Sequence, residues 1–179
     1  MRLIVVGCEY AGKTTFIKEL EKWAKERCIN IHSHSHFTFP RKEWSEKDNK
    51  GFMEMTPGFR ESFKRYEMEY HVLILRLDDN LVLEGFHIEE AVYAPLYYGY
   101  TPYAFYYGEE ELNHVNTVLV LLKASPETIL KRMEENPHKF QCIKKEDTPI
   151  ILKRFEEEYH NSTLRKKMTI DTTNQTPKE

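Results

Sequence analysis

A glycine-bracketed loop near the start of the chain restricts the fold more than any other segment. GCEYAGKT, residues 7–14, fits the pattern G-x-x-x-x-G-K-[ST]. The apolar run RLIVV before it predicts a buried strand, and the amphipathic stretch after it predicts a helix. In such a loop the backbone N–H groups and the start of the helix point at phosphate oxygens. The complete motif in this context therefore predicts a binding site for a nucleoside triphosphate.

Individual side chains of the loop have predicted roles in binding the nucleotide and its metal ion. Lys13 is expected to reach the β- and γ-phosphates, and the Thr14 hydroxyl is expected to ligate Mg²⁺. ATP and Mg²⁺ are therefore the predicted cofactors. We interpret Cys8 as a bystander thiol rather than a reactive one. The loop residues predicted to bind the nucleotide are Gly7, Ala11, Gly12, Lys13, Thr14 and Thr15.

Strands and helices alternate along the rest of the chain. Strands are predicted at RLIVVG (2–7), CINIHSH (28–34), LVLEG (81–85), NTVLVLL (116–122) and KMTID (167–171). Helices are predicted from residue 12 onward and over 59–77, 88–99, 109–114, 125–133 and 147–159. This order predicts a three-layer α/β fold, in which helices cover both faces of a five-stranded parallel sheet. Residues 1–179 are most simply one domain at this length.

Particular residues define the helices and their ends. Pro95 is expected to end or kink the helix over 88–99. Ser125 and Asp147 are expected to cap the two helices that follow them, each with a proline in the first turn. Residues 37–57 are rich in charge and predict a loop or a short irregular insertion. One face of the first helix is formed by Phe16, Leu20, Trp23 and Ala24. One face of the helix over 59–77, at alternating spacings of four and three, is formed by Phe59, Phe63, Tyr66, Tyr70, Leu73 and Leu77.

Composition and charge exclude several classes of protein. No apolar run approaches the ~20 residues that span a bilayer, and the first residues lack a signal-peptide pattern, so no membrane partner is expected. Three cysteines without metal-ligand spacing favour a reducing, cytoplasmic compartment. A net charge of −3 argues against a nucleic-acid partner. The partners that we consider are a small-molecule acceptor and a second copy of the chain in a homodimer.

The carboxylate of Glu84, at the end of the strand over 81–85, helps to distinguish a GTPase switch or a motor ATPase from an enzyme that transfers a phosphoryl group. The chain lacks the Asn/Thr-Lys-x-Asp guanine reader of GTPase switches, and it is smaller than most motor ATPases. Glu84 is expected to lie beside the phosphate loop, because ligands of parallel sheets bind at the carboxyl ends of strands. There it could hold Mg²⁺ through water or accept the proton of an attacking hydroxyl group. The alternative is a solvated glutamate at a strand end.

Three segments resemble the deoxynucleoside kinase and thymidylate kinase group of P-loop NTPase folds. LVLEGFHIEEAVYAPLY (81–97) resembles the acidic strand end and the following helix of that group, including a Val-Tyr step at Val92 and Tyr93. LLKASPETILKRM (121–133) is similar to a strand followed by an SPE helix in the group. KKMTIDTTNQTPKE (166–179) resembles its last strand and the loop that packs on adenine.

The resemblance implies site residues beyond the loop. It places Arg132 where the group has a catalytic arginine that contacts phosphate, and Thr172 and Thr173 near the adenine base. One position departs from the pattern, because Gly85 stands where the group has an arginine that helps to hold the acceptor. A nucleoside monophosphate is thereby disfavoured as the acceptor, unless Arg60, Arg65 or another cation reaches the site.

The acceptor is expected to bind between an insertion at 33–60, which the resemblance leaves unmatched, and a lid at 136–147. The lid carries Lys139, Lys144 and Lys145, whose charges could stabilise the transferred phosphoryl group. The residues predicted to bind the acceptor are His36, His87 and Tyr93. For His87, a structural role in the interior is the alternative.

Two further clusters have competing interpretations. Seven tyrosines between residues 93 and 107 could line a pocket that stacks a flat acceptor, but we expect most of them to pack in the helix layer. His32, His34 and His36 would share one face of an extended strand, with the outer two ~13 Å apart, too far for all three to bind one metal ion. A polar strand end that lines the acceptor cleft is the preferred interpretation.

The leading hypothesis is a kinase that transfers the γ-phosphoryl group of ATP to a small acceptor, a nucleoside or a nucleotide, with Lys13, Glu84 and Arg132 as catalytic residues. A second hypothesis is a kinase for a non-nucleoside metabolite or drug, which Gly85 and the unmatched insertion favour. A third is a nucleotide-binding regulatory module without transfer activity. TPKE, residues 176–179, is expected to begin a further helix at the point where the sequence stops.

Overall fold

The computed structural model describes residues 1–38, 43–102, 108–139 and 141–176. Parts of four predictions lie outside these residues: positions 39–42 of the insertion, three of the seven tyrosines (Tyr103, Tyr106 and Tyr107), position 140 of the lid, and 177–179 of the last expected helix. The strands are β1 (Leu3–Val6), β2 (His32–Ser35), β3 (Leu81–Glu84), β4 (Val118–Lys123) and β5 (Lys166–Asp171). The helices are α1 (Lys13–Glu26), α2 (Glu46–Met53), α3 (Pro57–Leu77), α4 (His87–Tyr93), α5 (Gly108–His114), α6 (Pro126–Glu135) and α7 (Thr148–Asn161), with a π-helical turn η1 (Ala94–Tyr98) and a 3₁₀ turn η2 (Lys145–Asp147).

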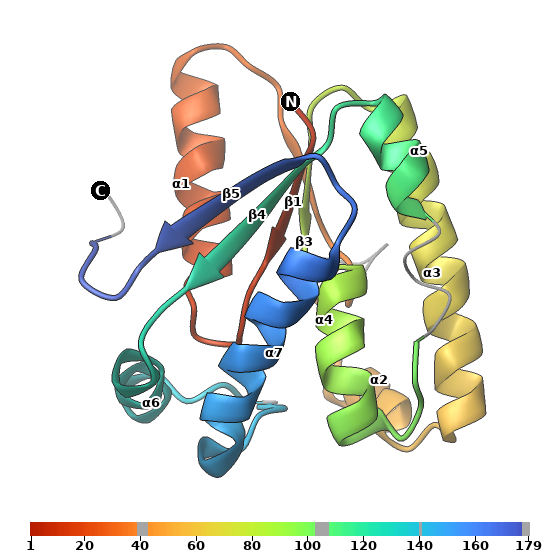
Figure 1. The fold of residues 1–179 in the computed structure, drawn as a ribbon, viewed down its shortest axis with the longest axis vertical. Coiled ribbons are helices and arrows are strands. Elements are labelled where there is room, and N and C mark those ends of the chain that lie inside the picture. Colours follow the sequence, from red (N-terminus) through yellow and green to blue (C-terminus); the bar gives the residue numbers. More distant parts are fainter. Residues whose placement is uncertain (39–42, 103–107, 140, 177–179) are drawn as a thin grey trace.

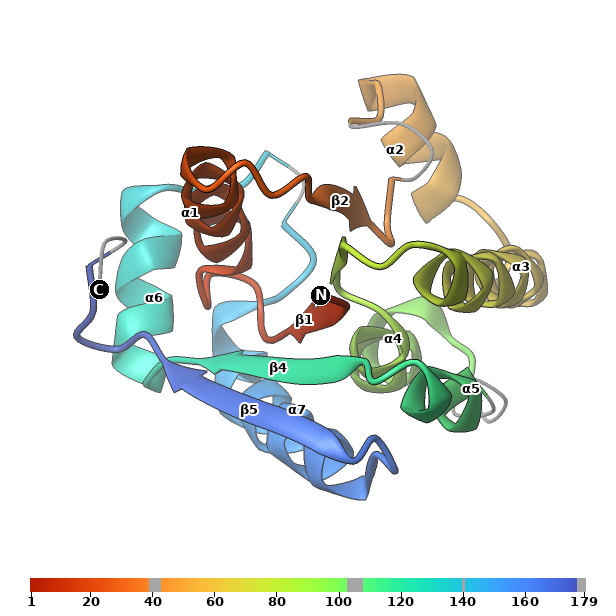
Figure 2. The same cartoon turned by 90° about the horizontal axis from the view of Figure 1, so that it is seen from above.

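The five strands form one parallel sheet in the order β2-β3-β1-β4-β5. Helix α1 covers one face of the sheet, and α4 and α7 cover the other (Figures 1 and 2). The predicted three-layer α/β fold is therefore confirmed. In the sheet register Val5 of β1 is opposite Glu84 of β3, so the phosphate loop and the acidic strand end leave the sheet at the same edge.

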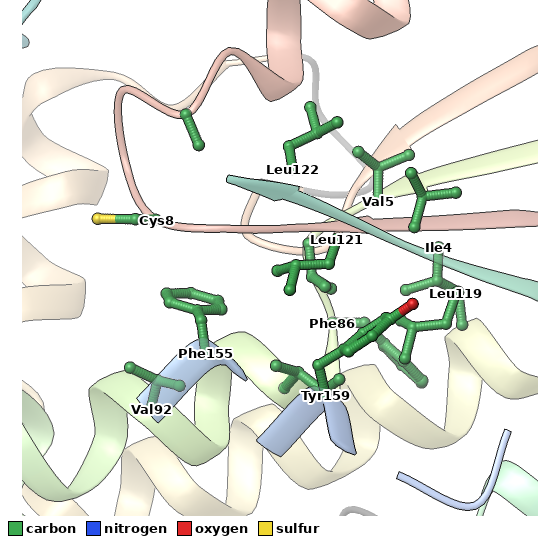
Figure 3. Close-up of a cluster of buried hydrophobic side chains, with 14 of the residues drawn as sticks. Ile4, Val5, Cys8, Phe86, Val92, Leu119, Leu121, Leu122, Phe155 and Tyr159 are labelled. Atoms are coloured by element: carbon green, nitrogen blue, oxygen red, sulfur yellow. The ribbon is translucent and has the colours of Figure 1, made fainter. Parts of the chain in front are cut away.

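The core lies between the sheet and the layer of α4 and α7. Figure 3 shows Phe155 and Tyr159 of α7 facing side chains of the central strands. These strands are almost entirely apolar, because they are covered on both faces. The buried residues that Figure 3 labels are Ile4, Val5, Cys8, Phe86, Val92, Leu119, Leu121, Leu122, Phe155 and Tyr159.

The prediction of an irregular segment over 37–57 is wrong for its second half, where the chain forms α2. Ser45 caps this helix and accepts a hydrogen bond from the backbone N–H of Asp48 at 3.2 Å. The Asp48 carboxylate in turn accepts from the backbone N–H of Ser45, which completes a capping box. This Ser-x-x-Asp spacing was the local signal for the helix, and it outweighs the charged composition of the segment.

Helix α3 is present as predicted, but its apolar face lies at the surface. Tyr66, Leu77 and Phe59 are 79%, 76% and 75% exposed. The opposite face is the buried one, and it includes Lys64, Met68, His71 and Leu75. A smaller difference of the same kind occurs in α1, where Trp23 is 43% exposed and Ile17 points into the core instead.

The α3 helix has 21 residues, but charged side chains interrupt it throughout. No helix in the described part of the chain is both long and apolar enough to cross a membrane.

The ends of several elements test the capping predictions. Ser125 accepts a hydrogen bond from the Thr128 N–H at 3.2 Å, so its predicted cap on α6 is confirmed. Asp147 is the N-cap residue of α7 as predicted, but it makes no side-chain capping hydrogen bond, and its carboxylate accepts the hydroxyl of Tyr97 instead. Helix α4 ends at Tyr93 and continues into the π-helical turn that contains Pro95, as expected for a proline at this position.

Phe155 lies at the centre of the core between α7 and the sheet, which makes it a test of this layer. Phe155→Ala should lower the free energy of unfolding by about 3–5 kcal/mol, because truncation loses buried apolar surface and leaves a cavity. Urea denaturation would measure the change. Ile150→Ala, on the half-exposed side of the same helix, is the control and should shift stability by about 0.5 kcal/mol or less. Similar losses in both variants would contradict the assigned core.

Candidate functional site

The phosphate loop passes close to β4 and then turns into α1. A Cβ added to Gly7, which has a φ of +153°, would lie 2.3 Å from the carbonyl oxygen of Leu122, so a side chain does not fit there. Gly12 adopts the left-handed conformation directly before α1, at a φ of +96°. Burial raises the pKa of the neighbouring Cys8 thiol to about 12, which agrees with its interpretation as a bystander.

The Lys13 ammonium lies inside the curve of the loop. It donates hydrogen bonds to the carbonyl oxygens of Gly7 at 2.7 Å and Cys8 at 3.3 Å. It also forms an ion pair with Glu89 Oε1 at 3.2 Å. Burial tends to lower the pKa of Lys13, but the carboxylates of Glu89 and Glu84 outweigh this effect and raise it above its ordinary value. The amine is therefore held charged where phosphates would enter the loop.

Thr14 and Glu84 meet, as the sequence predicted for the two proposed metal ligands. The Thr14 hydroxyl donates a hydrogen bond to Glu84 Oε1 at 2.7 Å. Thr14 is the second residue of α1 and Glu84 is the last residue of β3. Thr15, the next residue of α1, is exposed beside them. Hydroxyl and carboxylate oxygens are ligands that Mg²⁺ prefers in proteins, so these two side chains fit a magnesium site.

Gly85 has a structural reason to lack a side chain. Its φ is +76°, and an added Cβ would lie 2.0 Å from Nδ1 of His36 and 2.8 Å from Oε2 of Glu89. The space that a side chain would need beside the strand end is taken by an imidazole and a carboxylate. Nδ1 of His36 is also 3.1 Å from the carbonyl oxygen of Glu84, which holds the ring in this place.

A cleft of about 490 Å³ opens from the loop toward α2 and α4. Four carboxylates and three aromatic rings dominate its wall, together with the two predicted acceptor residues His36 and Tyr93. The lining residues are Glu9, Lys13, Ser35, His36, Phe37, Asn49, Phe52, Met53, Glu84, Glu89, Glu90, Tyr93, Tyr98, Lys139, Gln141 and Cys142. Tyr93 also accepts a hydrogen bond from the backbone N–H of Glu9, which ties α4 to the loop.

Behind the cleft lies a buried cluster of charged side chains. Lys64 of α3 is fully buried and pairs with Glu67 at 2.6 Å and with Glu90 at 3.7 Å. Tyr100 donates a hydrogen bond to Glu90 at 2.6 Å. Burial alone would raise the pKa of Glu90, but Lys64 and His36 outweigh it and lower the pKa below its ordinary value. Glu90 therefore presents a fixed negative charge to the cleft.

The prediction that His87 binds the acceptor is wrong. His87 is completely buried, and its Nε2 lies 2.6 Å from Oε1 of Glu109 in α5. It therefore belongs to the interior and is not among the described residues that line the cleft. The signal that placed it near the chemistry was only its distance of three residues from Glu84 along the chain.

The structure brings Arg132 to the loop, but against backbone oxygens. Its guanidinium donates to the carbonyl oxygens of Tyr10 at 3.0 Å and Thr172 at 2.6 Å. The Thr172 hydroxyl lies beside the loop, 3.0 Å from the carbonyl oxygen of Ala11, and Thr173 accepts from the N–H of Ser125. The contact of Arg132 with a transferred phosphoryl group, and that of both threonines with a nucleotide, stay predictions.

The described part of the lid at 136–147 folds over the phosphate loop. His138 stacks on Tyr10 with ring centroids 4.1 Å apart, and Tyr10 donates a hydrogen bond to Gln141 at 2.8 Å. Lys139 lines the cleft and pairs with Glu46 of α2, so the lid also contacts the predicted insertion. Lys145 points elsewhere, because it pairs with Glu134 of α6 at 2.7 Å.

In the tyrosine cluster and in the histidine cluster predicted from the sequence, some members line the cleft and others do not. Of the described tyrosines between 93 and 107, Tyr93 and Tyr98 line the cleft, whereas Tyr97 and Tyr100 donate their hydroxyls to carboxylates. His32 pairs with Asp78 at 2.6 Å, and His36 turns into the cleft one residue beyond β2. Within the described ranges, no group of three metal-binding side chains is found.

Sequence reasoning missed most of the acidic wall. Glu89 and Glu90 lie in the helix predicted over 88–99, and Glu9 occupies an unspecified position of the loop pattern, so none of the three is a predicted site residue. The available signal was the spacing of four residues between Glu89 and the predicted acceptor residue Tyr93, which places both on one face of a helix. No sequence pattern near Arg60 and Lys64 of α3 indicated that these two cations would be buried.

Comparisons with solved structures agree on the fold. YorR from Bacillus subtilis, solved in complex with phosphorylated GDP, is 19% identical with a TM-score of 0.65, over 100% of this chain and 90% of YorR. Deoxyadenosine kinase from M. mycoides with bound dATP is 14% identical with a TM-score of 0.65, over 99% of this chain and 94% of the kinase. The same kinase with its products dCMP and dCDP has a TM-score of 0.63. No family model and no curated protein matches the chain. The fold is thus that of P-loop kinases.

The buried pair of His87 and Glu109 predicts a pH-dependent stability. Burial tends to raise the pKa of Glu109, but hydrogen bonds from His87, Ser162 and Thr163 lower it to about 2 in the folded state, from an ordinary value of 4.5. The depressed pKa stabilises the fold above pH 4.5, and this contribution is lost as the pH falls toward about 2.

Glu109→Gln should remove that contribution, so its deficit in unfolding free energy should be constant above pH 5 and shrink between pH 4.5 and about 2. Urea denaturation at a series of pH values would measure it. Glu111→Gln, at an exposed position of the same helix, is the control and should show no such trend. A Glu109 deficit that stays constant down to the lowest accessible pH would contradict the assignment.

Proposed function

We propose that the chain is a kinase that transfers the γ-phosphoryl group of ATP to a hydroxyl group of a small, uncharged, nucleoside-like acceptor. The observation that carries the proposal is the Thr14–Glu84 hydrogen bond of 2.7 Å at one end of an acid-lined cleft. It joins the phosphate loop to a strand-end carboxylate, and phosphoryl-transfer enzymes need both at one place. Deoxyadenosine kinase, which has the same fold, supports a nucleoside-like acceptor.

The loop side would bind the nucleotide. Lys13 would turn from its carbonyl contacts to the β- and γ-phosphates, with the loop N–H groups around them. Thr14 and Glu84 would hold Mg²⁺, directly or through water. When bound, Mg²⁺ would neutralise charge on the phosphate oxygens. Arg132 would keep the loop in shape through Tyr10, so that the N–H groups stay directed at the phosphates.

The charge of the opposite wall favours an acceptor that donates hydrogen bonds. Glu9, Glu84, Glu89 and Glu90 face the cleft, where a phosphate carried by the acceptor would be repelled. A hydroxyl group would instead find acceptors for its proton. Phe37, Phe52 and Tyr98 add flat apolar surface on which a base could stack, at roughly 1–3 kcal/mol per base.

Within the described ranges, the two arginines considered above for holding an acceptor phosphate have other partners. Arg60 donates to the carbonyl oxygens of Phe52 and Met53, both at 2.8 Å. Arg65 is exposed and pairs with Glu61 of its own helix. Among the described residues that line the cleft, the lysines are Lys13, which the nucleotide needs, and Lys139 of the lid. This distribution supports a nucleoside rather than a nucleoside monophosphate.

An acceptor panel with ATP and Mg²⁺ would test the proposal. We expect ADP release with one or more deoxynucleosides, and at least tenfold lower kcat/KM with the corresponding monophosphates. Lys13→Ala should abolish turnover because the phosphate loop loses its positive charge, whereas Lys153→Ala, on the surface of α7, should keep it. Preferred transfer to monophosphates would contradict the uncharged acceptor. Activity only on other alcohols would favour the kinase of a non-nucleoside metabolite, and tight ATP binding without turnover would favour a regulatory module.

A further inference from the structure

Two carboxylates from outside the phosphate loop, Glu84 and Glu89, lie beside it and face different partners. Glu84, at the end of β3, accepts the Thr14 hydroxyl and so belongs to the nucleotide side. Glu89, in the first turn of α4, faces the Lys13 ammonium at 3.2 Å and lines the proposed acceptor cleft. Its side chain is 10% exposed, so it is shielded from bulk water but open to the cleft.

The surroundings of Glu89 leave its carboxylate available to a ligand. Oε1 is buried and, apart from the ion pair with Lys13, has no hydrogen-bond donor in the described part of the chain. Oε2 lies over Gly85, where an added Cβ would be 2.8 Å away. When Lys13 turns to the phosphates of a bound nucleotide, Glu89 would lose its partner while facing the terminal phosphate.

We propose that Glu89 is the proton acceptor for the attacking hydroxyl group of the acceptor, a role that rests on the proposed function. The acceptor oxygen forms a bond to the γ-phosphorus, and the bond from that phosphorus to the bridging oxygen breaks, with its electron pair leaving on ADP. The hydroxyl proton passes to Glu89, which later releases it to water. In this proposal Glu84 serves as a ligand of Mg²⁺ and not as the base, in keeping with its hydrogen bond to Thr14.

Glu89→Gln keeps the size of the side chain but cannot take a proton. With the acceptor that the wild type uses best, kcat should fall by about 10²–10⁴, the range measured for general bases. ATP binding by calorimetry should be equal or tighter, because Lys13 is no longer held by a carboxylate. The acidic limb of the kcat pH profile should disappear in this variant, and Glu89→Asp should recover part of the rate.

Glu135→Gln, at an exposed position of α6, is the matched control and should keep the wild-type rate and pH profile. An unchanged kcat in Glu89→Gln, or a rate loss with the acidic limb intact, would overturn the role of Glu89 while leaving the kinase proposal in place. A wild-type chain that binds ATP but transfers to no acceptor would overturn both.

Discussion

The shape of the phosphate loop depends on the close approach of Gly7 to the backbone of β4. Because a Cβ at Gly7 would collide with the Leu122 carbonyl oxygen, only glycine lets the chain leave β1 in this direction. The loop then curls back far enough for the Lys13 ammonium to reach the Gly7 carbonyl oxygen. Arg132 holds the other side of the loop through Tyr10. The positions of the lysine and of the threonine that follows it are thus consequences of one backbone contact.

The cleft wall formed by α4 depends on buried charge instead of backbone shape. Lys64 is fully buried, and its charge is balanced by Glu67, Glu90 and the faces of two aromatic rings. Burying such groups is costly, and removing one partner from a buried ion pair costs about 3–5 kcal/mol. The cluster therefore adds little net stability, but it fixes Glu90 and His36 in one arrangement. A cleft wall of this kind would offer the proposed acceptor carboxylates that are already oriented.

The parts of the molecule that short patterns encode could be predicted from the sequence. The strands, the phosphate loop, the Ser125 cap and the meeting of Thr14 with Glu84 follow from local spacing and from the geometry of parallel strands. The errors involve partners far along the chain. His87 is buried and pairs with Glu109 of α5, and the Asp147 carboxylate at the start of α7 accepts the Tyr97 hydroxyl instead of a helix N–H. A helical apolar stripe predicts a buried face, but it does not say whether the covering surface belongs to the same chain.

The position of the Glu89 carboxylate depends on the absence of a side chain at Gly85. Any side chain at 85 would displace the imidazole of His36 and the carboxylate of Glu89, so the two residues depend on that glycine. Relative to kinases with an arginine at this place, the strand end exchanges a cation for an anion. Two like charges 4 Å apart repel by about 4 kcal/mol at the effective dielectric constant of a protein surface. An acceptor with its own phosphate would meet that repulsion, whereas a hydroxyl group would donate a hydrogen bond to the carboxylates. In the proposed kinase the exchange would therefore favour an uncharged acceptor.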